Sequence, residues 1–249
     1  ELRRLGIGAP HEVRMNPSSG DYPAHLEAWR PLSPSVDELT LALELPGFRW
    51  KAGQYLHLGR EATGSEKPYS IASAPHPALP QRVQLAVSRS ESEEAEPPPW
   101  RVGERFRLRG PSGRFVRDAF EDRGAILVGT GTGVAPLRAM VQAEAERASG
   151  AELVLIAGFR NEAESLWHEE FAALAERLPR FHYLPTLSAG SPEWRGKRGY
   201  VQSHLVEVLD AFAPAPLFLC GRRAMIEACK VLLHTRASTL PPEWIITEG

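Results

Sequence analysis

Residues 129–136, with the sequence GTGTGVAP, restrict the fold of this chain more than any other segment. They follow AILVG (125–129), a short uninterrupted apolar run typical of a strand buried on both faces of a sheet. A helical pattern begins directly afterwards, at Val134. In such a unit, glycines let a phosphate approach the backbone, and the amides at the helix start attract its charge. The context favours a dinucleotide-binding turn over a plain strand–helix turn.

Strands and helices alternate through the rest of the second half. The pattern predicts strands at 125–129, 152–158, 181–188, 216–221 and 244–247, and helices at 134–147, 162–178, 201–209 and 222–234. This alternation predicts an α/β domain with a doubly wound parallel sheet, because right-handed crossovers join successive parallel strands. We assign residues 119–249 to this domain.

The first half follows a different pattern. Short stretches with period-two alternation, separated by turn residues, occur at 39–45, 54–59, 82–89 and 104–110. They predict an antiparallel β-barrel over residues 21–118, with the domain boundary near 117–122. Residues 1–20 are polar, broken by Pro and Gly, and are predicted to form an irregular extension. The acidic, proline-rich stretch 88–100 is interpreted as a solvated hairpin loop.

Composition excludes several classes of protein. The formal net charge is -2 and no long basic run occurs, so nucleic acid is not an expected partner. No window approaches the roughly 18 apolar residues of a membrane span, and the start lacks the apolar core of a signal peptide, so a cytoplasmic location is the default expectation. The chain has only Cys220 and Cys229 and no paired-histidine spacing, which predicts no metal site and no iron–sulfur cluster of its own.

Four motifs in order resemble the ferredoxin–NADP⁺ reductase superfamily. They are KPYSIAS (67–73), GPSGRF (110–115), GTGTGVAP (129–136) and CGRRAM (220–225). The resemblance runs from about His25 to the C-terminus. It implies that the barrel binds FAD, with FMN as the alternative, and that the second domain brings NAD(P)H beside the flavin.

On the flavin side, the resemblance implies that Tyr69 flanks the isoalloxazine ring and that Ser70 lies near its N5 atom. Lys67 stands where the family has an arginine on the flavin phosphate, which keeps the charge but loses the bidentate fork. The acidic stretch 88–100 replaces the family's pyrophosphate-binding segment. Negative side chains and prolines disfavour that contact, so the expectation is a differently held phosphate, FMN or loosely bound FAD. The full set of flavin-side residues is Lys67, Pro68, Tyr69, Ser70, Val87, Ser88, Gly110, Ser112 and Gly113.

On the nucleotide side, the resemblance implies that Thr132 lies nearest the nicotinamide and that Cys220 packs beside it without acting as a nucleophile. Glu248 matches the acidic residue near the chain end of many relatives and is a candidate proton relay. Ser70, Cys220 and Glu248 are therefore the candidate catalytic residues. The nucleotide-side set is Gly131, Thr132, Gly133, Arg160, Ser188, Arg198, Tyr200, Gly221 and Met225.

The choice between NADH and NADPH stays open at this stage. Ser188 resembles the serine of the Ser–Arg pair of NADP-specific relatives, but Ala189 follows it in place of arginine. The basic cluster WRGKRGYV (194–201) favours a phosphate pocket instead.

The resulting hypothesis is an enzyme, a flavin-dependent NAD(P)H oxidoreductase. It would transfer hydride from NAD(P)H to flavin N5 and pass electrons to an acceptor such as a ferredoxin or an oxygenase component. Two alternatives remain: an NAD(P)H:flavin reductase that uses flavin as a substrate, and a degenerate nucleotide-binding module without redox turnover. A hydrolase is excluded because no GxSxG elbow occurs.

Overall fold

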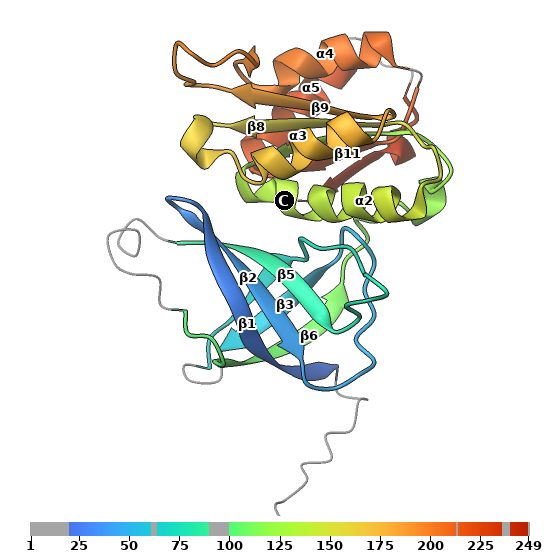
Figure 1. Ribbon diagram of the computed structural model, residues 1–249. Helices are drawn as coiled ribbons and strands as arrows, with labels where there is room; N and C mark the ends of the chain where they lie inside the picture. The colour runs from blue at the N-terminus through green and yellow to red at the C-terminus, as the bar shows by residue number, and fades with distance from the viewer. Residues whose placement is uncertain (1–19, 61–63, 90–99, 213, 236–239, 249) are drawn as a thin grey trace, which may run out of the picture.

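The computed structural model describes residues 20–60, 64–89, 100–212, 214–235 and 240–248. Two domains are stacked, a barrel below and an α/β domain above in the view of Figure 1. The predicted N-terminal extension lies outside the described residues except for Gly20, and so does most of the predicted hairpin loop at 88–100.

The first domain is a six-stranded antiparallel sheet that closes on itself. Its strands are β1 (Asp21–Ser33), β2 (Val36–Leu43), β3 (Tyr55–Arg60), β4 (Glu66–Ser70), β5 (Arg82–Ser88) and β6 (Arg105–Ser112). Their order is β4-β3-β6-β1-β2-β5, and a bridge between Ile71 and Leu85 joins the two ends. Along β6, Phe106 and Leu108 are buried while Arg105, Arg107 and Arg109, which alternate with them, are exposed. This alternation is the reason that the sequence pattern predicted a barrel.

The second domain is a six-stranded parallel sheet. Its strands are β7 (Ala125–Thr130), β8 (Leu153–Phe159), β9 (Phe181–Leu187), β10 (Lys197–Arg198), β11 (Leu217–Cys220) and β12 (Ile245–Glu248), in the order β10-β9-β8-β7-β11-β12. The chain winds outward from β7 in one direction and then returns to its other side with β11. The switch point of the sheet therefore lies between β7 and β11, where open α/β sheets bind ligands.

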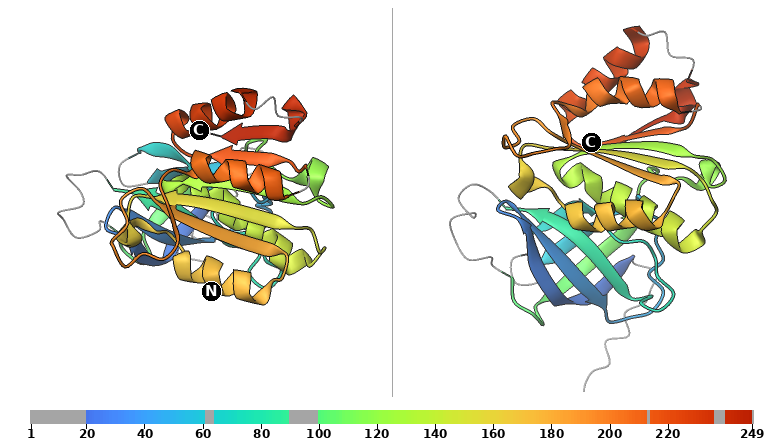
Figure 2. Two further views of the ribbon diagram at one scale, coloured as in Figure 1. Left: turned by 90° about the horizontal axis from the view of Figure 1, so that it is seen from above. Right: turned by 45° about the horizontal axis from the view of Figure 1, so that its top comes forward.

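Helices cover both faces of this sheet. Helices α2 (Val134–Arg147) and α3 (His168–Arg177) lie between the sheet and the barrel, whereas α4 (Val201–Ala211) and α5 (Arg223–Thr235) cover the far face (Figures 1 and 2). Each face has its own buried cluster, with Leu127 and Leu155 turned to one side and Val128 and Ile156 to the other. The predicted two-domain fold class is confirmed.

The helix predicted over 162–178 is wrong in its first third. A short 3-10 turn, η4 (Glu162–Glu164), is followed by a break, and α3 starts only at His168. Trp167 at the break adopts a left-handed backbone with φ 52°. Contacts with the barrel explain the break, because the Trp167 indole donates to Glu38 and the Glu164 carboxylate accepts from Ser33. Helical periodicity does not report such contacts.

The strands β1, β4 and β10 were not among the predicted segments. Strand β1 carries two irregularities in its pairing with β2, between Leu26 and Ala28 and between Pro31 and Ser33, and these interrupt the period-two pattern. Strand β10 is only two residues long.

The chain passes from barrel to sheet over residues 113–124, which include the 3-10 turn η2 (Asp118–Phe120). The boundary placed at 118/119 falls within this connection, and the division into domains stays a prediction. Among the described residues, no helix has both the length and the apolar character needed to cross a membrane.

Candidate functional site

A cleft of about 1280 Å³ opens at the carboxyl edge of the parallel sheet, against the barrel. Barrel residues such as Ser35 and Ser70 line it together with Thr130 and Cys220 from the two strands at the switch point. Typical small-molecule sites occupy roughly 300–1,000 Å³. The cleft is therefore large enough for more than one ligand group, and its walls come from both domains.

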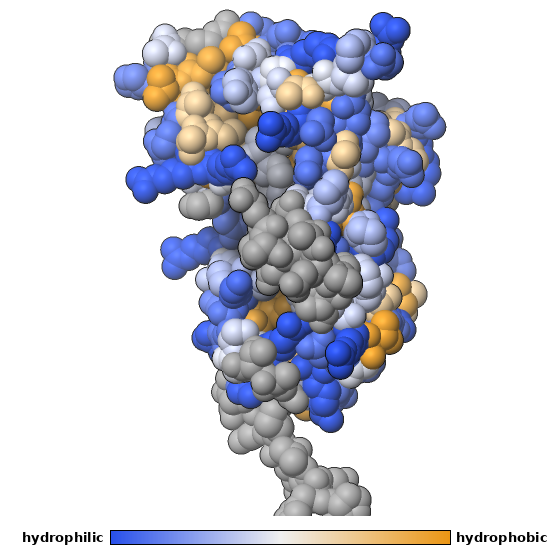
Figure 3. All heavy atoms as spheres, turned by 90° about the vertical axis from the view of Figure 1, so that its left-hand side faces the viewer, coloured by the Kyte–Doolittle hydropathy of each residue, from blue (hydrophilic) through white to orange (hydrophobic). Residues whose placement is uncertain are grey.

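The side of the molecule seen in Figure 3, which is the left-hand side of Figure 1, carries mainly hydrophilic residues on both domains. Hydrophobic residues form separate groups within this surface. The described surface on this side is thus predominantly polar.

The predicted phosphate-binding turn forms one wall of the cleft. Gly131–Gly133 is a 3-10 turn between β7 and α2, and Gly131 has φ 55°. A Cβ added at Gly131 would meet no atom within 4 Å, so the backbone there faces open space. A Cβ at Gly133 would lie 2.4 Å from the carbonyl oxygen of Cys220. The first glycine leaves room for a ligand, and the second permits close packing of the turn on β11.

Cys220 ends β11 and is buried, with 5% of its surface exposed. Burial, reinforced by the nearby Glu248 carboxylate, raises the pKa of its thiol. The sulfur is thus protonated at neutral pH and is a poor nucleophile. Gly221, the next residue, has φ 142°, and a Cβ there would lie 2.4 Å from Thr130 Oγ1. Only glycine fits this junction between β11 and β7.

Glu248 ends β12 and is paired in register with Cys220. Burial raises the pKa of its carboxyl to about 7, and a hydrogen bond from Ser70 partly offsets this effect. Ser70 belongs to the barrel, so this contact spans the two domains. A residue near the end of the chain and a residue of the predicted flavin motif thus meet in one place.

Two buried polar atoms in the cleft have no hydrogen-bond partner among the described residues. They are Thr130 Oγ1 and Glu248 Oε2. Buried polar atoms are nearly always paired, so both atoms suit a ligand that offers hydrogen-bonding groups. Together with the open space at Gly131, they fit a polar, phosphate-bearing cofactor and its partner in this cleft.

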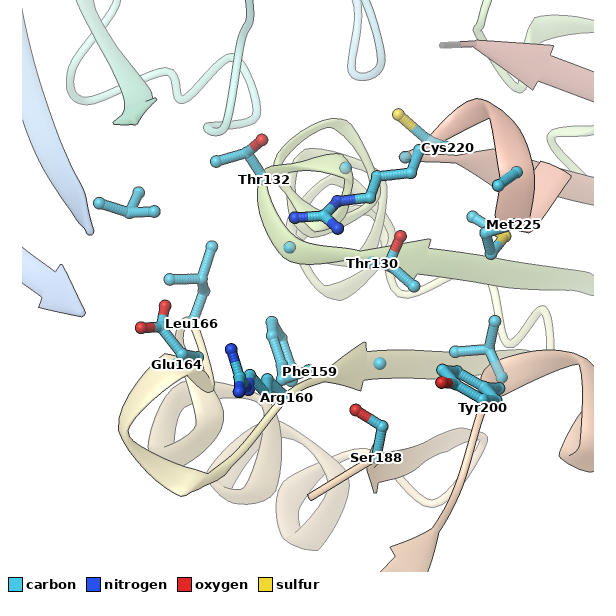
Figure 4. Close-up of a pocket in the computed structure, with 18 of the residues that line it drawn as sticks. Thr130, Thr132, Phe159, Arg160, Glu164, Leu166, Ser188, Tyr200, Cys220 and Met225 are labelled. Atoms are coloured by element: carbon cyan, nitrogen blue, oxygen red, sulfur yellow. The ribbon is translucent and has the colours of Figure 1, made fainter. Parts of the chain in front are cut away.

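Figure 4 shows how the labelled side chains are distributed. Thr132 and Cys220 lie at one end of the cleft, and Ser188 and Tyr200 at the other. Tyr200 is 66% exposed, which leaves one face of an aromatic ring free for stacking. The span between the two ends suits an extended ligand.

The structure brings most of the predicted residues into the cleft. Those that line it are Ser70, Ser88, Gly131, Thr132, Gly133, Arg160, Ser188, Tyr200, Cys220, Gly221, Met225 and Glu248. Those that do not line it are Lys67, Pro68, Tyr69, Val87, Gly110, Ser112, Gly113 and Arg198. All of the latter except Arg198 lie on β4, β5 or β6 or directly beside them.

The guanidinium of Arg198 is bonded to its own loop and does not line the cleft. Its guanidinium donates to the carbonyl oxygens of Gly190, Ser191 and Trp194 at 2.6 to 3.0 Å. It therefore holds the loop before β10 together. The expected cationic contact of Arg198 with a nucleotide phosphate stays a prediction that requires these bonds to break.

Sequence reasoning missed several lining residues, among them Ser35, Thr130 and Glu164. Thr130 directly precedes the glycine turn, so its position was readable from the sequence. Ser35 and Glu164 had no such signal. The Ser35 hydroxyl donates to Glu164 Oε2 at 2.9 Å, a contact between residues 129 positions apart that exists only because the domains are packed together.

Comparison with known proteins agrees with this architecture. The family described as "Oxidoreductase NAD-binding domain" matches residues 127–231. Ferredoxin--NADP reductase B of Sorangium cellulosum is 38% identical over 222 residues, which are 85% of this chain and 90% of that protein. The phenol 2-monooxygenase reductase component DmpP of Pseudomonas sp. (strain CF600) is 32% identical over 84% of this chain, but this chain spans only 60% of its length.

Among solved structures, the Amycolatopsis cytochrome P450 reductase GcoB is similar, with a TM-score of 0.79 and 27% identity. The match covers 92% of this chain and 69% of that one. The two-domain fold, the interdomain cleft and the extent of the match to a ferredoxin–NADP reductase together establish the family. The chain belongs to the ferredoxin–NADP⁺ reductase superfamily of flavin-dependent NAD(P)H oxidoreductases.

Proposed function

We propose that this enzyme binds FAD against its barrel, transfers a hydride from NAD(P)H to the flavin, and delivers the electrons to a protein acceptor. The observation that carries the proposal is the cleft itself, which is lined both by Ser70 of the barrel and by the Gly131–Gly133 turn of the second domain. When bound, the flavin supplies the redox chemistry by taking two electrons as a hydride at N5 and releasing them singly.

The barrel residues hold and orient the ring. Tyr69 and Ser70 end β4, and Ser70 is the flavin-motif residue that lines the cleft, with its hydroxyl directed to Glu248. In the proposal, Ser70 hydrogen-bonds near N5 and Tyr69 packs on the ring face. Lys67 is exposed on the same strand and supplies a positive charge for the phosphate.

The second domain orients the nicotinamide nucleotide. The amides around Gly131 bind its pyrophosphate, since this backbone faces open space at the start of a helix. Thr132 and Cys220 contact the nicotinamide end, while Ser188 and Tyr200 contact the adenosine end (Figure 4). Cys220 acts through its shape, because a buried neutral thiol packs as a small apolar group.

Glu248 holds or releases a proton near neutral pH, because burial raises its pKa to about 7. Its hydrogen bond with Ser70 offers a direct route for that proton to the flavin side of the cleft. We propose that Glu248 relays a proton between solvent and this position.

The acceptor is proposed to be a ferredoxin or an oxygenase component. Two relatives carry names of this kind, a ferredoxin–NADP reductase and a phenol 2-monooxygenase reductase component.

An absorption spectrum of the purified enzyme, recorded anaerobically before and after NADH or NADPH, tests the proposal. Flavin absorbance that bleaches with either nucleotide, and recovers when a ferredoxin is added, supports it. Protein that stays colourless after incubation with FAD and with FMN refutes it. The nucleotide that bleaches at lower concentration identifies the donor.

The alternative is a reductase that uses flavin as a diffusible substrate. Lys67 favours it, because an exposed lysine binds a phosphate less tightly than a bidentate arginine. Gel filtration distinguishes the two: flavin that elutes with the protein indicates a resident cofactor, and flavin that separates from it indicates a substrate.

A further inference from the structure

Arg138 is a charged residue buried between the two domains, with 5% of its surface exposed. It lies in the second turn of α2. Its Nη1 donates to the carbonyl oxygen of Ala72 at 3.0 Å and to Gln84 Oε1 at 2.9 Å, both in the barrel domain. Its Nε and Nη2 donate to the Glu170 carboxylate of α3 at 2.8 to 2.9 Å. One guanidinium thus joins two helices of the α/β domain to the barrel.

A second buried charge completes this junction. Glu38 on β2 is 3% exposed, and its Oε2 lies 3.6 Å from Arg138 Nη1. The same oxygen accepts from Trp167 Nε1 at 2.6 Å, and the other accepts from Arg30 Nε at 2.8 Å. The Trp167 ring also lies 4.8 Å from the Arg138 guanidinium carbon. Two cations, Arg138 and Arg30, balance two carboxylates, Glu38 and Glu170, of which Arg138 and Glu38 are buried while Arg30 is exposed and Glu170 partly exposed. Buried polar groups with their partners in place are rigid.

The position of this junction in the chain links the two halves of the cleft. Helix α2 begins directly after the Gly131–Gly133 turn, so a shift of the helix moves the turn with it. Ala72 follows Ser70 by two residues. Sliding α2 across the barrel would break both hydrogen bonds from Arg138 Nη1 and leave charges buried without partners, which is costly.

We propose that Arg138 is a positioning residue for hydride transfer, which holds the nicotinamide-binding turn at a set distance from Ser70. This inference rests on the proposed function. Arg138 does not line the cleft, so it acts through α2 and through the segment after Ser70. Hydride transfer demands close approach of the two rings, and a displacement of about 1 Å costs on the order of a hundredfold in rate.

The test compares Arg138→Met and Arg138→Lys with the wild-type holoenzyme. Anaerobic stopped-flow gives the limiting rate of flavin bleaching at saturating nucleotide and the nucleotide Kd. Arg117→Met is the matched control. Arg117 lies in the connection between the domains, is also buried, and pairs with Glu144 of α2 at 3.3 Å. Its other bond is to the Arg123 carbonyl of the same connection, so it joins α2 to this connection and to no strand of the barrel.

We expect Arg138→Met to lower the limiting rate roughly ten- to a hundredfold while the Kd changes less than about threefold. Arg138→Lys should recover part of the rate, because it keeps the charge and one bond. Arg117→Met should lower thermal stability yet keep the limiting rate within about twofold. If Arg138→Met does not fold, the same comparison is made with Arg138→Lys alone.

Two results overturn the inference. One is a limiting rate that both Arg138 variants retain, and the other is a loss that Arg117→Met reproduces in proportion to its fall in stability. Bleaching of the wild-type flavin by NADH or NADPH distinguishes a failure of this inference from a failure of the proposed function. If neither nucleotide bleaches the wild-type flavin, the proposed reaction itself is refuted, and the role of Arg138 with it.

Discussion

Replacing Glu248 with glutamine should stabilise the protein above pH 7 and stabilise it much less near pH 5. Burial raises the pKa of this carboxyl from its ordinary 4.5 to about 7, so the folded protein binds its proton more tightly than the unfolded chain does. Between these two pKa values the free energy of unfolding falls as the pH rises, because the unfolded chain releases the proton that the folded protein retains.

The magnitude follows from the same values. A rise from 4.5 to about 7 corresponds to about 3 kcal/mol at alkaline pH. Glu248 is only partly buried, and solvent screening reduces this to about 2 kcal/mol. The neutral amide of the variant avoids the cost. For a chain of this size, about 2 kcal/mol corresponds to a Tm higher by about 4–8 °C.

Thermal unfolding of wild type and Glu248→Gln at pH 5 and pH 8 measures the effect. The expected outcome is a higher Tm for the variant at pH 8 and a much smaller difference at pH 5, where only the first part of the loss has occurred. A gain of the same size at both pH values would show that Glu248 does not titrate as the geometry requires. A loss at pH 8 would show that the carboxylate is stabilised in the folded state, contrary to the reasoning.

Three further predictions concern the cleft and the two cysteines. Ser70→Ala should slow flavin bleaching by NAD(P)H about tenfold, the equivalent of one hydrogen bond, with an unchanged nucleotide Kd in stopped-flow titration. Gly133→Ala should lower stability by about 1–3 kcal/mol in urea unfolding, because its Cβ would lie 2.4 Å from the Cys220 carbonyl oxygen; a variant as stable as wild type would contradict this packing. Neither thiol should react with iodoacetamide at pH 8 in the folded protein, since burial raises the pKa of Cys220 and that of Cys229, the latter to about 11. Mass spectrometry of folded and guanidinium-treated protein checks this, and labelling of the folded form would refute it.

Local sequence predicted most of the fold because each element carries its own pattern. The helix at 134–147 begins and ends where its periodicity does, and the strands β7, β8 and β9 follow from uninterrupted apolar runs. The helix at 162–178 was mispredicted where Trp167 and Glu164 contact the barrel. Periodicity describes which face of a helix is buried, and it carries no information about a partner that arrives from another domain.

The candidate site divides in the same way. The glycine turn and Cys220 were readable from strand–turn junctions, because a parallel sheet gathers its carboxyl ends at one edge. Ser70 and Glu248 were each predicted as site residues, but their contact with one another could not be predicted, because 178 positions separate them in the sequence. The bonds that Arg198 makes to its own loop were equally hidden.

The sequence by itself determined the two kinds of domain, their order, and the residue types at the turn and strand ends. These depend on interactions over a few residues, which hydrophobic spacing and glycine placement report directly. Only the tertiary structure decided how the domains meet. Arg138, Glu38 and Trp167 form one junction, and the pKa of Glu248 rises to about 7, because packing removes these groups from water and sets which charges face one another.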